Sequence, residues 1–105
     1  MSQVYEDEHI FAFRDVHPQA PIHVLVIPKD HIEMLVDMKE PEHTMLAGKM
    51  MLVAAKIVEL EGGNTGKKGI GGYRLILNNG RDAQQEVYHV HLHVLAGSQP
   101  WKKSR

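Results

Sequence analysis

Histidines and apolar residues alternate along residues 88–95, which read Tyr-His-Val-His-Leu-His-Val-Leu. A period of two is typical of a β-strand, whose successive side chains point to opposite faces of a sheet. His89, His91 and His93 then share one face, with neighbouring Cα atoms roughly 6.5 to 7 Å apart. The apolar side chains on the other face need a covering layer. Residues 87–95 are therefore predicted to form the last strand of a sheet that packs under a helix.

Three imidazoles on one strand face are costly to bury unless they are hydrogen-bonded or used. They could form a partly solvated polar face, or they could chelate zinc with His23 as a further ligand. Alternatively, one imidazole is a covalent nucleophile that its neighbours orient. We favour the nucleophile, because three histidines in register are too many for a simple solvated face. In addition, no carboxylate is obviously placed as the general base of a zinc enzyme.

Imidazole suits nucleophilic attack on phosphorus. Its ordinary pKa is about 6.5, so much of it is neutral and nucleophilic near pH 7. A nucleotidylated imidazole is also a good leaving group for water, which divides one hydrolysis into two displacements. The phosphoryl oxygens then need N–H donors. Asn78, Gln84 and Gln85, in and just before a polar turn at residues 79–86, are candidates for that role.

Other periodic segments predict the elements around this strand. Residues 10–14, 23–27 and 73–78 predict strands, and the second is apolar on both faces and therefore central. A long helix is predicted from about Pro41 to Gly62, and residues 31–38 predict a short one. The apolar stripe of the long helix consists of Leu46, Met50, Val53, Ile57 and Leu60. Together these elements predict one α+β domain, residues 1–105, built on an antiparallel sheet.

The segment at residues 62–72 is rich in glycine and contains Gly66-Lys67. A phosphate-binding P-loop would need a different spacing, a Ser or Thr after the lysine, and a preceding strand. This segment follows a helix and has Lys68 after the lysine. We expect a surface connection there.

Charge and composition restrict the partners. The 12 lysines and arginines nearly balance 13 acidic residues, so no strong field attracts nucleic acid or an anionic membrane. The sequence has no cysteine, which excludes thiol nucleophiles and thiolate zinc sites. No apolar run approaches the ~20 residues that span a bilayer, and the acidic N-terminus lacks a signal-peptide pattern. We expect a soluble cytoplasmic protein, with the nucleus as an alternative.

Two motifs resemble a known family. The segment His89-Val-His-Leu-His-Val-Leu95 resembles the signature of the histidine-triad (HIT) superfamily, in which histidines alternate with apolar residues. The stretch Asp15-Val-His-Pro-Gln-Ala-Pro-Ile-His-Val-Leu-Val-Ile-Pro-Lys29 resembles the upstream segment of its Hint branch. Residues 73–78 and 85–88 agree as well. The resemblance covers nearly the whole chain in the right order.

The resemblance implies a role for each histidine of the motif. His91, the middle one, is the expected nucleophile, and His93 is expected to bind the phosphate and assist the leaving group. His89 and His23 are the expected supporting polar shell. The other expected site residues bind substrate: Asp15 and Val16 the ribose, Phe13 the base, and Asn78, Gln84, Gln85 and Glu86 the surroundings of the α-phosphate.

The resemblance also implies a fold and an activity. The HIT fold has a five-stranded antiparallel sheet with one long and one short helix per subunit, and the sheet continues across a homodimer. Hint proteins bind purine nucleotides such as AMP and GMP and hydrolyse nucleoside phosphoramidates, without a metal cofactor. A nucleotide-binding scaffold with incidental hydrolysis and a dinucleoside polyphosphate hydrolase of the Fhit type are the alternatives.

The chain departs from the family pattern in two places. Family members usually begin with a further segment that helps to wall the base pocket, whereas this chain begins almost at the following strand. We therefore expect a weaker hold on the base. The turn before Gln85 usually carries two glycines, where this chain has Ala83 and Gln84. Glycine lets a backbone approach a phosphate closely, so we expect this loop to differ.

Overall fold

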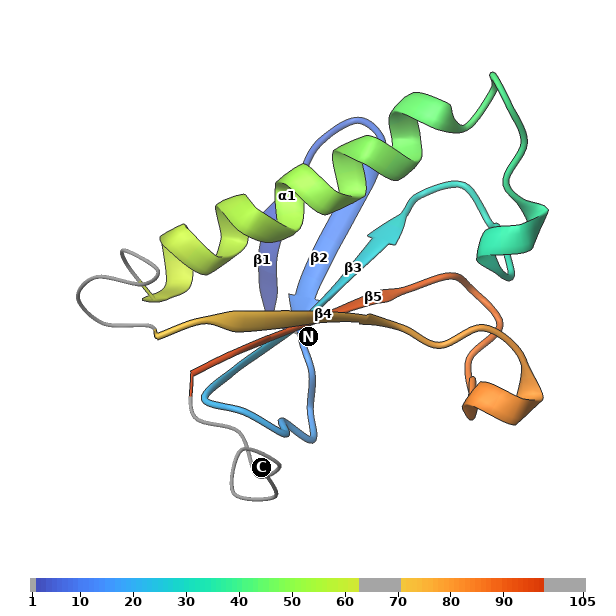
Figure 1. The fold of residues 1–105 in the computed structure, drawn as a ribbon. Helices are drawn as coiled ribbons and strands as arrows, with labels where there is room; N and C mark the ends of the chain where they lie inside the picture. The colour runs from blue at the N-terminus through green and yellow to red at the C-terminus, as the bar shows by residue number, and fades with distance from the viewer. Residues whose placement is uncertain (1, 63–70, 98–105) are drawn as a thin grey trace.

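The structure is a computed structural model that describes residues 2–62 and 71–97. Within these residues a five-stranded antiparallel sheet carries one long helix on one face (Figure 1). The strands are β1 (Gln3–Glu6), β2 (Ile10–Arg14), β3 (Ile22–Pro28), β4 (Tyr73–Leu77) and β5 (Leu92–Ala96), in the order β1-β2-β3-β5-β4. The helix is α1 (Thr44–Gly62), and two 3-10 turns are η1 (Leu35–Asp37) and η2 (Arg81–Ala83). The predicted α+β fold is confirmed.

The core lies between α1 and the middle strands. Val24 and Val26 of β3 and Val94 of β5 are fully buried beneath the helix. The helix contributes five buried residues to this layer: Met50, Val53, Ala54, Ile57 and Val58. The prediction that residues 23–27 form a central strand is confirmed, because β3 pairs with both β2 and β5.

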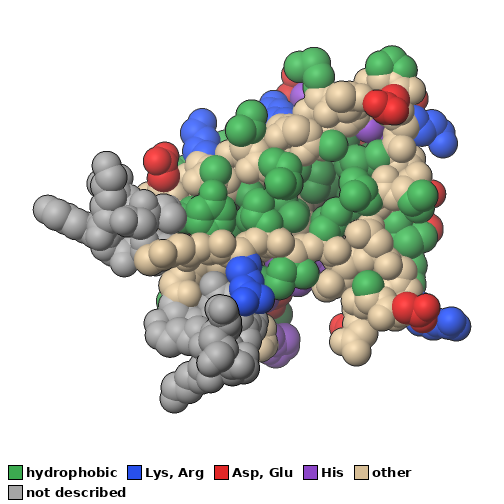
Figure 2. All heavy atoms as spheres, in the orientation of Figure 1, with side chains coloured by type: hydrophobic (Ala, Val, Ile, Leu, Met, Phe, Trp, Pro, Cys, Tyr) green, Lys and Arg blue, Asp and Glu red, His purple; other side chains and the backbone are tan. Residues whose placement is uncertain are grey.

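Hydrophobic side chains also gather on the molecular surface between α1 and the edge strand β4 (Figure 2). Leu75 and Leu77 of β4 are only partly buried against the core. Met51 of α1 is 52% exposed. No helix in the described parts of the chain is long and apolar enough to cross a bilayer.

Two helix predictions need correction. The long helix begins at Thr44 rather than near Pro41. Leu60 does not belong to the core stripe, since it is 63% exposed, and Ala54 and Val58 fill the core instead. The predicted short helix at residues 31–38 is a single 3-10 turn, η1, preceded by irregular backbone.

The histidine segment is extended but only partly in the sheet. The prediction of a strand at residues 87–95 is wrong at its start, because β5 begins at Leu92. The alternation persists nevertheless: Val90, Leu92 and Val94 are buried, and His89, His91 and His93 are half-buried. Tyr88 is exposed rather than packed under the helix.

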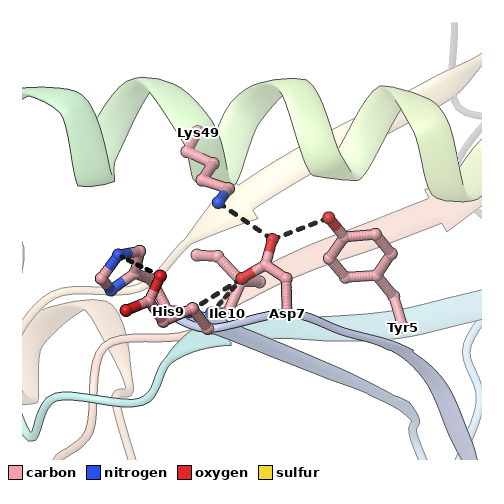
Figure 3. Close-up of polar contacts among 6 residues, drawn as sticks. Tyr5, Asp7, His9, Ile10 and Lys49 are labelled. Atoms are coloured by element: carbon pink, nitrogen blue, oxygen red, sulfur yellow. Dashed lines mark hydrogen bonds and ion pairs between the residues drawn. The ribbon is translucent and has the colours of Figure 1, made fainter.

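Strand β1, which the sequence did not predict, is linked to α1 through Asp7 in the turn after it. One carboxylate oxygen of Asp7 accepts hydrogen bonds from the N–H groups of His9 and Ile10, and the other accepts one from the Tyr5 hydroxyl (Figure 3). The Nζ atom of Lys49 lies 3.1 Å from the second oxygen. The Tyr5 hydroxyl, the two N–H groups and Lys49 hold the pKa of Asp7 well below its usual range.

The surface connection predicted at the glycine-rich residues 62–72 falls mostly on residues 63–70, which lie outside the described residues.

Candidate active site

The histidines lie on the sheet face opposite α1. In the register of the sheet, Phe13, Leu25, His93 and Ile76 form one row across β2, β3, β5 and β4. Their immediate neighbours Ala12, Val24 and Val94 point to the helix, so this row points away from it. A half-buried, mostly apolar floor therefore surrounds the ring of His93.

The hydrogen bonds of His91 leave one ring nitrogen available. Its Nδ1 lies 2.8 Å from the carbonyl oxygen of His89. A carbonyl can only accept, so Nδ1 carries the proton, and in the neutral ring Nε2 has the lone pair. His89 is held in a similar way, since its Nε2 lies 2.8 Å from the carbonyl oxygen of Pro28 and donates to it. In its neutral form His91 can therefore act as a nucleophile through Nε2.

A second chain of hydrogen bonds assigns the proton of His93. The backbone N–H of Gln19 donates to Nδ1 of His23 over 3.0 Å. His23 in its neutral form therefore carries its proton on Nε2, which lies 3.0 Å from Nδ1 of His93. His93 accepts there, so its own proton is on Nε2. The rings of His91 and His93 meet edge to face, with centroids 5.1 Å apart.

Burial keeps the imidazoles of His93 and His23 neutral. It lowers the pKa of His93 to about 4, with further lowering from the neighbouring His91 and His23 and a smaller opposing effect of Asp15. Burial also lowers the pKa of His23, against the attraction of the Asp15 carboxylate. Near pH 7 the site therefore presents His93 as a neutral N–H donor beside the ring of His91.

Among the described residues, Asp15, His23 and His93 have a spacing that could suit a metal ion, with ligand atoms within 4.8 Å of one another. The hydrogen bonds argue against a fit. A metal on Nε2 of His23 would move that ring's proton to Nδ1, where it would face the N–H of Gln19. Two donors would then oppose each other in a buried position, which is costly. The zinc interpretation is therefore disfavoured by this geometry.

The expected ribose and base residues lie at the edge of this cluster. Asp15 accepts a hydrogen bond from the N–H of His17 through one oxygen, and its other oxygen lies 3.5 Å from Nε2 of His23. Val16 is 78% exposed. Phe13 is half-buried, with its ring centroid 5.6 Å from that of Phe11. The structure thus brings Asp15 to the histidines and leaves Val16 and part of Phe13 accessible.

The expected phosphate residues do not form one group. Asn78 is half-buried just after β4, and Gln84 and Glu86 are exposed. Gln85 is 5% exposed and points inward: its amide nitrogen donates to the carbonyls of Glu33 and Val87. The expectation that the Gln85 side chain donates to a phosphate is not met, because both of its N–H groups are already engaged.

Two groups that orient the histidines could not be identified from the sequence. The N–H of Gln19 and the carbonyl of Pro28 are backbone groups, which no residue type reveals. A weak signal is the run Pro-Gln-Ala-Pro at residues 18–21, whose two prolines restrict the backbone around Gln19.

Comparison with known proteins adds independent information. A sequence profile described as HIT domain matches residues 1–100. The purine nucleoside phosphoramidase of Escherichia coli K12 is 48% identical over 94 residues, which are 90% of this chain and 74% of that protein. A HIT family hydrolase from Legionella pneumophila Philadelphia 1 superposes with a TM-score of 0.82 at 42% identity, covering 93% of this chain and 82% of that one. A histidine triad protein from Clostridium difficile gives a TM-score of 0.79 at 39% identity, covering 93% and 80%.

Proposed function

This chain belongs to the HIT domain family, and on that premise we propose that it hydrolyses purine nucleoside phosphoramidates through a nucleotidyl-His91 intermediate. The observation that carries the proposal is the pair of proton assignments in the site. His91 offers a lone pair on Nε2, and His93 offers an N–H on Nε2. A nucleophile next to a donor is what displacement at a charged phosphorus requires.

In the first step, Nε2 of His91 forms a bond to the α-phosphorus while the bond from phosphorus to the amine nitrogen breaks. The departing nitrogen takes up a proton from water and leaves as an amine. In the second step a water oxygen bonds to phosphorus, the bond to His91 breaks, and the proton of that water returns to solvent. Throughout, the N–H of His93 donates to the phosphoryl oxygens, whose charge it stabilises.

The remaining expected residues hold the nucleoside in this proposal. The free lone pairs of the Asp15 carboxylate accept from the ribose hydroxyls beside Val16, and Phe13 contacts the purine of AMP or GMP. Asn78, Gln84 and Glu86 border the phosphate. His89 and His23 act through His91 and His93, respectively, and are positioning residues.

We also propose that two copies form a homodimer whose sheets join through β4. Strand β4 stands at the end of the described sheet. Hydrophobic side chains lie exposed between it and α1 (Figure 2), and Met51 of α1 is 52% exposed. A solvent-exposed apolar patch next to an open strand edge favours self-association. Met51→Glu is expected to convert the dimer to a monomer in sedimentation velocity, whereas Val36→Glu, at a valine that is 80% exposed, is expected to leave it dimeric.

The activity is tested with an adenosine phosphoramidate. We expect turnover by the wild-type protein and a nucleotide adduct on His91 in mass spectrometry of quenched reactions. His91→Ala is expected to fold and to lose essentially all turnover, while His9→Ala, at an exposed histidine in a turn, keeps it. Faster turnover of diadenosine polyphosphates than of the phosphoramidate would indicate the Fhit-type activity instead. An active His91→Ala protein would reject the mechanism.

A further inference from the structure

Residues 87–91 carry two of the three histidines but lie outside the sheet, because β5 begins at Leu92. The ladder hydrogen bonds that fix His93 between β3 and β4 therefore do not extend to His91. In general, displacing a reacting group by about 1 Å can cost roughly 10²-fold in rate. The backbone that carries the nucleophile consequently needs another support.

That support is the irregular segment at residues 31–35, which we call the bracing segment. The N–H of Val90 donates to the carbonyl oxygen of Ile32 over 2.6 Å. Val90 stands between His89 and His91 and is only 1% exposed. The ring of His31 meets the ring of His89 edge to face, with centroids 5.0 Å apart. The bracing segment thus contacts the catalytic backbone between the two histidines.

Two side-chain amides hold the bracing segment in turn. The amide nitrogen of Gln85 donates to the carbonyl of Glu33 over 2.7 Å and to that of Val87 over 3.1 Å. Its oxygen accepts from the N–H of Gly80 over 2.7 Å. At the far end of the segment, Oδ1 of Asn79 accepts from the N–H of Leu35 over 2.8 Å. Gln85 is nearly inaccessible to solvent, so water cannot easily replace its hydrogen bonds.

We infer that Gln85 and Asn79 are positioning residues for the reaction at His91, acting through the bracing segment. This inference rests on the proposed function for its activity readout. Gln85 joins three pieces of backbone: the turn after β4, the bracing segment, and the approach to His89. Neither amide needs to touch the substrate for this role. Their loss displaces His91 while the apolar core under α1 keeps its packing.

The test compares Gln85→Met, which keeps the length and flexibility of the side chain but removes its hydrogen bonds, with wild type. At saturating phosphoramidate we expect kcat to fall about 10- to 100-fold while KM changes less than threefold. Native-state hydrogen exchange of the Val90 N–H is expected to be at least tenfold faster, with the amides of α1 unchanged. Asn79→Ala is expected to lower kcat about threefold, because Gln85 still holds Glu33.

Two controls separate positioning from general stability. Gln3→Met makes the same chemical change at an exposed position of β1, and Lys49→Met removes the ion pair that links α1 to Asp7. Both are expected to keep kcat within twofold when the protein is folded by circular dichroism. If Gln85→Met does not fold, Asn79→Ala carries the test. An unchanged kcat, or unchanged exchange at Val90, would overturn the inference. If the wild-type protein does not hydrolyse the phosphoramidate, but the Val90 N–H still exchanges faster in Gln85→Met than in wild type, the proposed function alone would be rejected.

Discussion

The Nε2 atom of His23 lies 3.0 Å from the Nδ1 atom of His93, which joins the central strand β3 to β5 on the face away from the helix. His23 is buried, and the N–H of Gln19 occupies its other ring nitrogen. The proton of His23 therefore has one position in the neutral ring, and it dictates the proton position of His93 in turn. A backbone amide on a loop thus determines which nitrogen of His93 carries the proton.

Removing the donor at position 23 tests this relationship. His23→Leu keeps an apolar group in the buried site but gives Nδ1 of His93 no donor, so the His93 proton divides between its two nitrogens. We expect kcat to fall about tenfold or more, which corresponds to roughly 1.4 kcal/mol of transition-state free energy. His23→Gln, whose amide can donate again, is expected to recover most of the rate. Nitrogen-15 NMR of the His93 ring checks the cause, and a single Nε2-protonated form in His23→Leu would contradict it.

The free energy of unfolding is expected to fall on mild acidification because of His23 and His93. The pKa of His93 is lowered from 6.5 to about 4 by burial, and that of His23 is lowered too. Between pH 6.5 and 4 the unfolded chain therefore binds protons that the folded chain does not, so the free energy of unfolding decreases as the pH falls. Because the His93 ring is partly exposed, we expect about 1–2 kcal/mol for it rather than the full shift.

Urea unfolding at several pH values measures this slope, and His93→Leu provides the comparison, because it removes one of the two groups. Asp7 does not interfere in that range. Its pKa is lowered, so the stability it contributes is lost only as the pH falls below the unfolded value of 3.8. An equal slope in wild type and His93→Leu between pH 6.5 and 4 would show that His93 is not its source.

The sequence predicted the sheet well where one strand face meets the core. In β3 and β5 the alternating apolar residues agree with the observed burial, and in α1 the stripe through Met50, Val53 and Ile57 does as well. Strand β1 was not predicted, because four residues with exposed ends carry too little periodicity. Alternation also could not reveal that the ladder stops at Leu92, since residues 89–91 keep the same alternating burial through contacts with the bracing segment.

The residue types of the candidate site could be predicted from the sequence, but the hydrogen-bond partners of its side chains could not. The triad and its proximity to His23 and Asp15 follow from the two motifs. The side chain of Gln85 was expected to face a ligand, and it instead holds backbone from three segments together. A polar residue in a polar turn gives no sign of its direction, because burial there depends on the tertiary position of residues 31–35.

Chelation is expected to leave the proposed hydrolysis unchanged. Attack by imidazole nitrogen on phosphorus needs no Lewis acid when N–H donors meet the phosphoryl charge. The three groups nearest to a ligand set, Asp15, His23 and His93, already interact with one another. Turnover of an adenosine phosphoramidate is measured before and after exhaustive dialysis against EDTA. Loss of activity that zinc restores would replace the covalent mechanism with a metal-assisted one.

Gln84 has a backbone conformation that is unfavourable for any residue with a side chain. Its φ of 63° and ψ of 36° lie in the left-handed region, and among the described residues it is the only non-glycine residue with a positive φ. The turn is kept there by neighbours: the N–H of Gln84 donates to Arg81 and that of Gln85 to Gly80. This conformation costs an L-residue about 1–2 kcal/mol of conformational free energy. For glycine the cost is instead about 0.5–1 kcal/mol of chain entropy lost on folding.

Gln84→Gly is therefore expected to raise the free energy of unfolding by about 0.5–1 kcal/mol, as measured by urea denaturation. Ala83→Gly is the matched control, since Ala83 sits in the 3-10 turn η2 with negative φ, where glycine brings only the entropic cost. The free energy of unfolding of Ala83→Gly is expected to be about 0.5–1 kcal/mol lower than that of the wild type. Opposite signs at two adjacent positions would show that the loop keeps a glycine-type conformation although glutamine occupies it. Destabilisation by both substitutions would mean that contacts of the Gln84 side chain outweigh its backbone strain.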